Sequence, residues 1–202
     1  VQEEYSGCHV SLSSSVIPQI REYPRLSTTA IDAYVGPKLG TYLRGLRGDL
    51  ADAGVADAQV YFMLSHGGLV PFETAADQGC RSLLSGPAAG VQAGAFFGER
   101  VDTTDLVTMD MGGTSCDVSV VVDGEVPETR ETELGGYPVA VPTVDVSAIG
   151  AGGGTEARVE AGRLRVGPES AGAHPGPLFH GRGGPVPTAA DPNAPPGRPC
   201  PA

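Results

Sequence analysis

The residues with the clearest chemical potential are Asp110 and the run Gly112-Gly113-Thr114-Ser115 just after it. Glycines let a backbone approach a phosphate and turn N–H groups toward it, while Thr114 and Ser115 add hydroxyl donors. Asp110 is anionic, so its natural partner is Mg²⁺, or a water on Mg²⁺, that the phosphates share. Asp117 lies two residues beyond Ser115 and can point to the same side of the returning strand as Ser115. The pattern favours nucleotide binding, and the alternative is an ordinary tight hairpin with an exposed aspartate.

The segments around this loop must hold it in place. Apolar runs predict a strand over Leu106–Asp110 and a returning strand over Val118–Val122. Upstream, Ser85-Gly86-Pro87 predicts the start of a helix that continues to about Phe97, with Ser85 as the cap and Pro87 in the first turn. A helix N-terminus is a second anion site, so we include Gly86 among the nucleotide-binding residues.

A second glycine-rich run, Gly150–Gly154, follows an apolar strand predicted over Thr143–Ile149. Its bare backbone could approach a nucleotide or a substrate, and we assign Gly152 and Gly153 to that role. The alternative is a flexible loop between two strands. The dipeptides Asp123-Gly124 and Ala161-Gly162 predict two further hairpin turns.

The N-terminal half is predicted to be mainly helical. Residues 1–27 look extended, and Thr28 or Thr29 can cap a helix that stops near Gly54. Gly36-Pro37 predicts a kink in this helix or two abutting helices. Helical spacing predicts that one apolar face belongs to the core. That face is formed by Ile31, Tyr34, Val35, Leu39, Tyr42, Leu43, Leu46 and Leu50.

Shorter elements follow this helix. We expect a strand over Gln59–Leu64, a turn at Ser65–Gly68 and a short helix over Glu73–Gln78. The order of helix, strand, helix, strand and hairpins predicts an α/β fold with a mixed sheet, flanking helices and β-hairpins. Residues 185–202 hold seven of the 18 prolines and predict a disordered tail.

Composition excludes several classes of protein. The 202 residues carry a net charge of −11, which argues against a nucleic-acid or acidic-membrane partner because both need clustered Lys and Arg. Lys38 is the only lysine, and no G-x-x-x-x-G-K-S/T loop occurs. No apolar run approaches the length of a membrane helix. We therefore predict a protein without a membrane partner.

The cysteines predict the cellular compartment. Cys8, Cys80, Cys116 and Cys200 show no C-x-x-C spacing, which argues against a zinc knuckle. Scattered single cysteines fit a reducing cytosol. A cytoplasmic location is the resulting expectation. The chain begins without methionine, and we expect it to be part of a longer protein.

Asp110–Ser119 resembles the second phosphate motif of the hydantoinase A/5-oxoprolinase family, within the sugar kinase/Hsp70/actin ATPase superfamily. Other stretches are similar to family motifs in the expected order. They are Arg25–Thr29, Ser65–Gly68, Ser85–Val91, Ile149–Thr155, Val166–Pro177 and Gly181–Gly184. The resemblance covers almost the whole chain. It also shows departures: Cys116 stands where the family usually has Thr, Asp32 and His66 where it has Asn, and His174 where Asp is common.

The resemblance implies an actin-like ATPase fold and a function. Residues 1–184 would form the central part, or second half, of the ATPase domain. ATP and Mg²⁺ would bind, with Asp110 as the catalytic and metal-positioning residue and Gly112, Gly113 and Thr114 on the terminal phosphates. Family members open cyclic amides such as hydantoin or 5-oxoproline, often with a hydantoinase B-type subunit or domain.

Two alternatives stay open. One is the ATP-using subunit of a ketone carboxylase that acts on acetone or acetophenone, because the resemblance covers that branch as well. The other is a non-catalytic, truncated remnant, because the family's first phosphate loop is not found in these residues.

Overall fold

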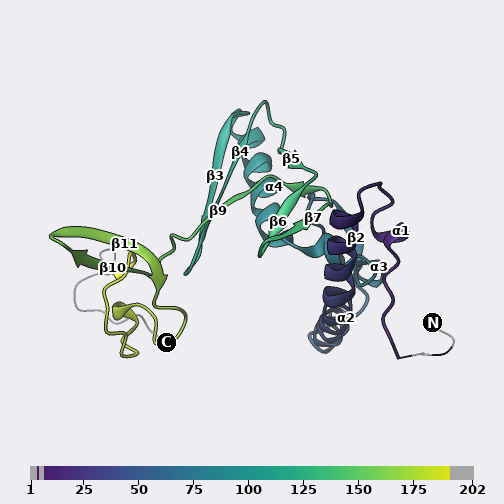
Figure 1. Cartoon of the computed structure of the whole chain (residues 1–202), viewed down its shortest axis with the longest axis horizontal. Helices are drawn as coiled ribbons and strands as arrows, with labels where there is room; N and C mark the ends of the chain where they lie inside the picture. Colours follow the sequence, from purple (N-terminus) through teal and green to yellow (C-terminus); the bar gives the residue numbers. More distant parts are fainter. Residues whose placement is uncertain (1–3, 5–6, 192–202) are drawn as a thin grey trace. The chain divides into compact units, whose positions relative to one another are not determined.

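The computed structural model describes residue 4 and residues 7–191. The chain divides into two compact units. Unit 1 comprises Val1–Thr104 and Val122–Asp145, and unit 2 comprises Asp105–Val121 and Val146–Ala202. Figure 1 labels the elements of both units. The phosphate-loop candidate belongs to unit 2.

The long helix α2 (Glu22–Asp52) dominates unit 1 and follows the short helix α1 (Ser13–Val16). The prediction that residues 1–27 are extended was therefore wrong for residues 13–16 and 22–27. Pro24 in the first helical turn needs no N–H partner, which lets α2 begin before Thr28. The helix runs unbroken through Pro37, not as two helices. It ends before Gly54, as predicted, and Gly54 has a φ of +84°.

The apolar face predicted for α2 is only partly buried. Leu43 lies in a core cluster with Phe72 and Ala75, and Leu39 and Leu46 pack against it. Tyr34 and Tyr42, however, are 67% and 60% exposed. Their assignment to the core was wrong for this chain as described, because a period of 3.6 marks a face but not what covers each position.

A small hairpin lies beside this core. Strand β1 (Tyr61–Met63) pairs antiparallel with β2 (Leu69–Pro71) across the predicted turn at Ser65–Gly68. Helix α3 (Phe72–Ala75) and the 3₁₀ turn η1 (Gly79–Ser82) continue the chain. Phe62 of β1 and Val70 of β2 pack on the Leu43 cluster, so the hairpin closes one side of the core.

Helix α4 (Ser85–Arg100) begins where the sequence predicts, but the predicted cap is wrong. Leu84 is the N-cap residue, with left-handed backbone angles, and no side chain caps the helix. Ser85 is already the first helical residue, so its hydroxyl is beyond the capping position. Pro87 lies in the first turn, as expected.

Residues 122–145 return to unit 1 as short paired strands. Asp123-Gly124 forms the predicted turn, with φ values of +53° and +78°. Two antiparallel pairs then form: β5 (Glu128–Thr129) with β8 (Thr143–Val144), and β6 (Thr132–Leu134) with β7 (Tyr137–Val139). Val139 and Val141 form a second core cluster with Cys80. Ile31 of α2 packs against this cluster, which ties the returning segment to the helix.

Unit 2 contains a three-stranded antiparallel sheet in the order β3-β4-β9. Its strands are β3 (Leu106–Met111), β4 (Cys116–Val121) and β9 (Ser147–Ile149). The predicted strand over Thr143–Ile149 is split, because β8 pairs in unit 1 and β9 pairs with β4. The sheet holds the candidate loop at the β3–β4 turn.

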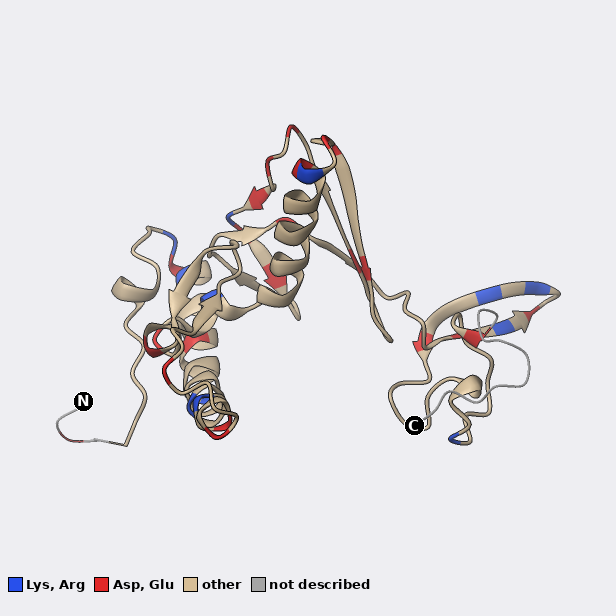
Figure 2. Ribbon diagram, turned by 180° about the vertical axis from the view of Figure 1, so that it is seen from behind, with Lys and Arg blue, Asp and Glu red and all other residues tan. Residues whose placement is uncertain are grey.

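The second hairpin of unit 2 joins β10 (Thr155–Glu160) and β11 (Arg163–Ser170) through Ala161-Gly162, as predicted. Figure 2 shows basic positions, in blue, on this hairpin, whose arginines are Arg158, Arg163 and Arg165. Arg158 and Arg165 pair with Glu156 and Glu160. The short 3₁₀ turn η2 (Leu178–His180) follows.

The part of the predicted tail that the structure describes, residues 185–191, belongs to unit 2. Thr188 is buried and forms an antiparallel bridge with Glu156. Residues 192–202 of that tail, including Cys200, lie outside the described residues.

The fold is mixed α/β, with helices and small antiparallel sheets. Every strand pairing among the described residues is antiparallel, so the single mixed sheet that we predicted is a wrong detail. The cause is that most paired strands are joined by tight turns, whereas parallel pairs need long crossovers. None of the helices in the described segments is long and apolar enough to cross a lipid bilayer.

Thr28 provides a test of how unit 1 is held together. Its buried hydroxyl donates to the Pro24 carbonyl and accepts from the Ala140 N–H at 3.0 Å. We expect Thr28→Val to leave the Ala140 N–H unpaired and to lower the free energy of unfolding by about 1–3 kcal/mol.

Thr29→Val is the matched control, because Thr29 makes the same contact within the helix, to the Arg25 carbonyl. It should change stability by less than about 0.5 kcal/mol. Urea unfolding followed by circular dichroism measures both variants. Equal losses would contradict the role given to the Ala140 contact.

Candidate phosphate-binding site

The candidate loop is the tip of the β3–β4 hairpin. Asp110 is directly opposite Asp117 in the antiparallel register. Directly opposite residues project to the same face of a sheet, so the two carboxylates share one face beside the tip. Asp110 is exposed and Asp117 is half-buried. Like charges in this arrangement repel each other, and a cation between them would remove that cost.

The hairpin tip leaves backbone donors free. Gly112 donates its N–H to the Ser115 carbonyl at 2.9 Å, which closes the turn. The N–H groups of Gly113 and Thr114 make no hydrogen bond to any residue that the structure describes, and both residues are exposed. Adjacent free N–H groups on a glycine-containing turn suit an anion such as a phosphate.

The second glycine run packs directly on this tip. Gly153 donates to the Gly112 carbonyl at 2.9 Å, and Gly154 donates to the Gly113 carbonyl at 2.6 Å. The carbonyl groups of Gly112 and Gly113 therefore point toward the second glycine run. In a trans peptide the N–H points opposite to the C=O, so the N–H groups of Gly113 and Thr114 point away from that run. The two predicted loops therefore form one backbone assembly within unit 2.

Gly152 explains why the second run contains glycine. A Cβ atom built on Gly152 would lie 2.6 Å from the carbonyl carbon of Gly113 and from the nitrogen of Thr114. No side chain fits at that distance. Gly152 is buried in this contact, so its bare backbone approaches the loop itself. Contact of Gly152 or Gly153 with a nucleotide stays a prediction.

Two residues that the sequence analysis did not single out support the assembly. Thr155 is buried, and its hydroxyl accepts from the Gly152 N–H at 2.7 Å. Asp191 accepts from the Phe179 N–H and from the N–H and hydroxyl of Thr188. Burial by itself would raise the pKa of Asp191, but these hydrogen bonds outweigh it and lower the pKa below the usual range.

Asp191 thereby orders a turn that reaches the glycine run. Ala190 donates to the Gly153 carbonyl and Ala189 to the Thr155 carbonyl, each at 2.9 Å. The only sequence signal for this role was the polar pair Thr188 and Asp191 at a spacing of three, which is too common to identify a support.

The side chains present fit a magnesium–nucleotide site better than a protein-enclosed metal site. No group of three or more His, Cys, Asp or Glu side chains that could hold a metal gathers among the described residues. Mg²⁺ needs only one or two carboxylates when phosphates and water complete its shell, and Asp110 and Asp117 supply that number.

The other predicted residues fall in different places. Ser115 is half-buried in the turn and accepts the Gly112 N–H through its carbonyl. Gly86 lies in the first turn of α4, in unit 1, and its role stays a prediction. Cys116 is fully buried, as expected for a small core residue rather than a nucleophile.

This architecture defines a class of protein. A mixed α/β chain presents a glycine-tipped hairpin with paired carboxylates and free N–H donors, which is the arrangement of a candidate phosphate-binding domain. A family model described as hydantoinase/oxoprolinase matches residues 25–198. The chain belongs to the hydantoinase/oxoprolinase family.

Two curated relatives show which enzymes of the family this chain is similar to. The chain is 38% identical to caprolactamase subunit alpha from Pseudomonas jessenii, over 88% of this chain and 26% of that protein. It is 40% identical to 5-oxoprolinase 1 from Arabidopsis thaliana, over 87% of this chain and 14% of that protein. The chain thus spans about a quarter or less of the length of these relatives.

Two solved structures share the fold. The crystal structure of an ATP-dependent caprolactamase from Pseudomonas jessenii matches with a TM-score of 0.71 and 36% identity, over 91% of this chain and 27% of that one. A nucleotide-free acetone carboxylase, from work on ATP-dependent acetone carboxylation, matches with a TM-score of 0.71 and 25% identity. That match covers 89% of this chain and 25% of the other.

The contact at Gly152 gives a direct test of the two-loop assembly. Gly152→Ala should push the Gly113–Thr114 peptide away and lower the free energy of unfolding by about 1–3 kcal/mol, because the added methyl has no room. The amide NMR signals of Gly113 and Thr114 should move as well.

Gly150→Ala is the matched control, since a Cβ there meets nothing within 4 Å. It should leave both the stability and those two amide signals nearly unchanged. Similar effects of the two substitutions would show that the second run does not pack on the hairpin tip as described.

Proposed function

We propose that this chain provides part of the Mg-ATP site of an enzyme that opens cyclic amides of the hydantoin, 5-oxoproline or lactam type. The observation that carries the proposal is the β3–β4 tip, where the free N–H groups of Gly113 and Thr114 lie next to the facing carboxylates of Asp110 and Asp117. Membership of the hydantoinase/oxoprolinase family gives this geometry its reaction class.

Each residue of the tip has a separate role in the proposal. Gly113 and Thr114 would donate backbone hydrogen bonds to the terminal phosphates, and Gly112 keeps the turn narrow through its bond to Ser115. Asp110 would hold Mg²⁺, with Asp117 as its neighbour on the same face. When bound, Mg²⁺ would neutralise charge that develops on the phosphates.

The chemistry that the family implies is activation of a carbonyl. Transfer of the γ-phosphoryl group of ATP to the amide oxygen would release ADP and turn that oxygen into a leaving group. Attack of one water at the same carbon, with proton transfer to the ring nitrogen and C–N cleavage, would open the ring to an amine and an acyl phosphate. A second water would hydrolyse the acyl phosphate to a carboxylate and inorganic phosphate. Oriented backbone donors favour such transfer more than covalent chemistry on the protein does.

A ketone carboxylase is the second candidate, because the acetone carboxylase structure matches this chain with the same TM-score as the caprolactamase. In that reading the same phosphate site would activate an enol oxygen or bicarbonate. The higher identity to the caprolactamase, 36% against 25%, supports the cyclic-amide reading.

The wider assignments follow from the relatives. One relative is named as a subunit of caprolactamase, which supports a companion subunit or domain of the hydantoinase B type. An actin-like ATPase fold stays our prediction and is consistent with the two matching solved structures, which are of ATP-dependent enzymes. A cytoplasmic location stays our prediction.

The role of Asp110 is tested by calorimetric titration of the chain with Mg-ATP. Asp110→Asn should weaken binding of Mg-ATP by about tenfold or more, because one charged ligand of the metal is lost. The same variant should lose much less affinity for ATP in EDTA. Asp57→Asn, in an exposed turn of unit 1, is the charge-matched control and should bind like the parent. Unchanged Mg-ATP affinity in Asp110→Asn would refute the assignment.

The reaction class is tested by ATP turnover of the protein as purified from its source. We expect ADP release to depend on 5-oxoproline, hydantoin or caprolactam and not on bicarbonate. Turnover that requires bicarbonate together with acetone or acetophenone would instead establish the carboxylase reading.

A further inference from the structure

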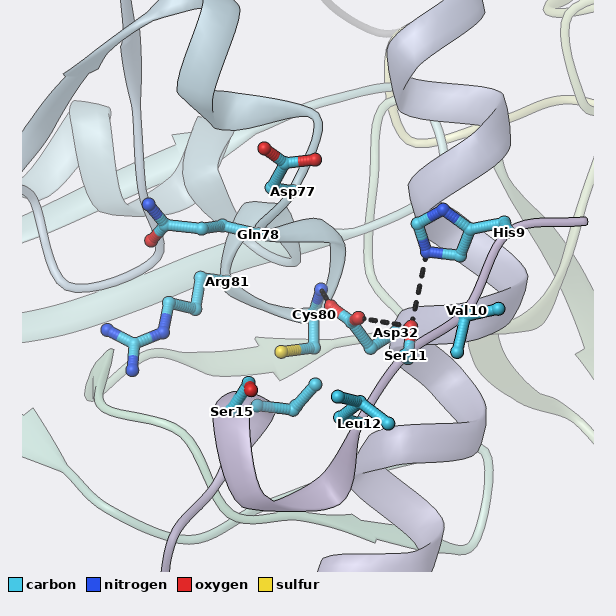
Figure 3. Close-up of a pocket in the computed structure, with 11 residues that line it drawn as sticks. His9, Val10, Ser11, Leu12, Ser15, Asp32, Asp77, Gln78, Cys80 and Arg81 are labelled. Atoms are coloured by element: carbon cyan, nitrogen blue, oxygen red, sulfur yellow. Dashed lines mark hydrogen bonds between the residues drawn. The ribbon is translucent and has the colours of Figure 1, made fainter. Parts of the chain in front are cut away.

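A cavity lies in unit 1, in a part of the chain that the phosphate site does not use. It measures about 530 Å³, within the range of small-molecule sites. Figure 3 shows the residues that line it, which come from the segment before α1, from α1 and α2, from the α3–η1 connection and from η1. The residues that line the cavity include acidic, basic and apolar side chains.

Two aspartates line the cavity, Asp32 of α2 and Asp77 of the α3–η1 connection, and Asp32 is the buried one. Asp32 is only 3% exposed, and its carboxylate accepts from the Ser11 hydroxyl at 2.7 Å and from the Cys80 N–H at 2.9 Å. No cationic side chain within the described residues forms an ion pair with it. Buried carboxylates are normally paired with a cation, and a carboxylate has about four acceptor sites. Asp32 can therefore accept a further, positively charged donor.

The remaining walls supply two other kinds of group. Arg81 and Gln78 provide donors at the same cavity, and Figure 3 shows the Cys80 side chain between those of Arg81 and Asp32. Val10, Leu12 and Val16 add an apolar surface. A ligand that satisfied all three parts would carry a cation, an aliphatic stretch and an anion.

The cavity is built on close backbone contacts and is not a chance gap. A Cβ on Gly36 would lie 2.8 Å from Nε2 of His9, so glycine is what admits the imidazole beside α2. A Cβ on Gly79 would lie 2.7 Å from the nitrogen of Gly36, which brings η1 against the same turn of the helix. These contacts fix the segments that carry Ser11, Asp32 and Cys80.

Covalent chemistry at this cavity is disfavoured. Burial, with a further contribution from the neighbouring Asp32, raises the pKa of the Cys80 thiol to about 12. The thiol therefore stays protonated at neutral pH and is a poor nucleophile. The cavity is equipped for non-covalent recognition of charge.

We propose that this cavity binds a linear ω-amino acid, with its ammonium group on Asp32, its carboxylate on Arg81 and its methylene chain along Val10, Leu12 and Val16. Hydrolysis of an unsubstituted lactam yields a compound of this class, so the origin of the ligand, though not the site itself, rests on the proposed function. The cavity would then sense or retain the ring-opened product.

The test is a calorimetric titration of the chain with 6-aminohexanoate, without nucleotide. Saturable binding is expected, and hexylamine and hexanoate, which each lack one charge, should bind about tenfold more weakly or worse. Glutamate, whose ammonium and α-carboxylate lie on one carbon, should also bind more weakly. Equal affinity for all four compounds, or no saturable binding of 6-aminohexanoate, would overturn the proposal.

Variants locate the site. Arg81→Gln and the isosteric Asp32→Asn should each weaken 6-aminohexanoate binding by about tenfold or more. Arg44→Gln, an exposed arginine of α2 outside the cavity, should not change it. Circular dichroism confirms that each variant is folded, and unchanged affinity in both cavity variants would refute the site. Asp110→Asn should retain 6-aminohexanoate binding, so failure of the nucleotide assignment and failure of this site give different results.

Discussion

The structure depends on backbone contacts that leave no room for a β-carbon. In unit 2, Gly152 lies against the Gly113–Thr114 peptide, and the bonds from Gly153 and Gly154 follow from that approach. In unit 1, Gly79 lies against Gly36, and Gly36 in turn admits His9. Each contact brings together segments that are distant in sequence. The phosphate-binding candidate and the amino-acid cavity are both built on such contacts.

Electrostatics supports the role that we propose for each of these frameworks. At the β3–β4 tip, Asp110 and Asp117 concentrate negative charge next to unpaired N–H donors, an arrangement that suits a metal and a phosphate together. In unit 1 the buried carboxylate of Asp32 faces a cavity that also carries Arg81. The net charge of −11 describes neither site, because the ligand that a site can bind depends on the charged groups within that site.

Sequence patterns predicted the elements better than their boundaries or their surroundings. The turns at Asp123-Gly124 and Ala161-Gly162 were confirmed because φ > 0 is required there and few residues satisfy it. The predicted start of α2 and the predicted cap of α4 were wrong, because many residue types are allowed at the first positions of a helix. Pro24 lies in the first turn of α2, and Leu84 is the N-cap of α4. Tyr34 and Tyr42 fit an apolar helical face yet are exposed, since periodicity does not reveal what covers a face.

The sequence by itself determined the α/β class, the hairpin loop from Asp110 to Ser115 and the resemblance to a family, because these depend on local backbone preference and on motif order. Only the tertiary structure decided that Gly152 supports that loop, that Thr155 and Asp191 hold the support, and that Asp32 lines a cavity with Arg81. The relations of Gly152 to Gly113, of Gly153 to Ala190 and of Asp32 to Arg81 join residues roughly 40 to 50 positions apart. Contacts over such separations follow from packing in three dimensions, which no local pattern encodes.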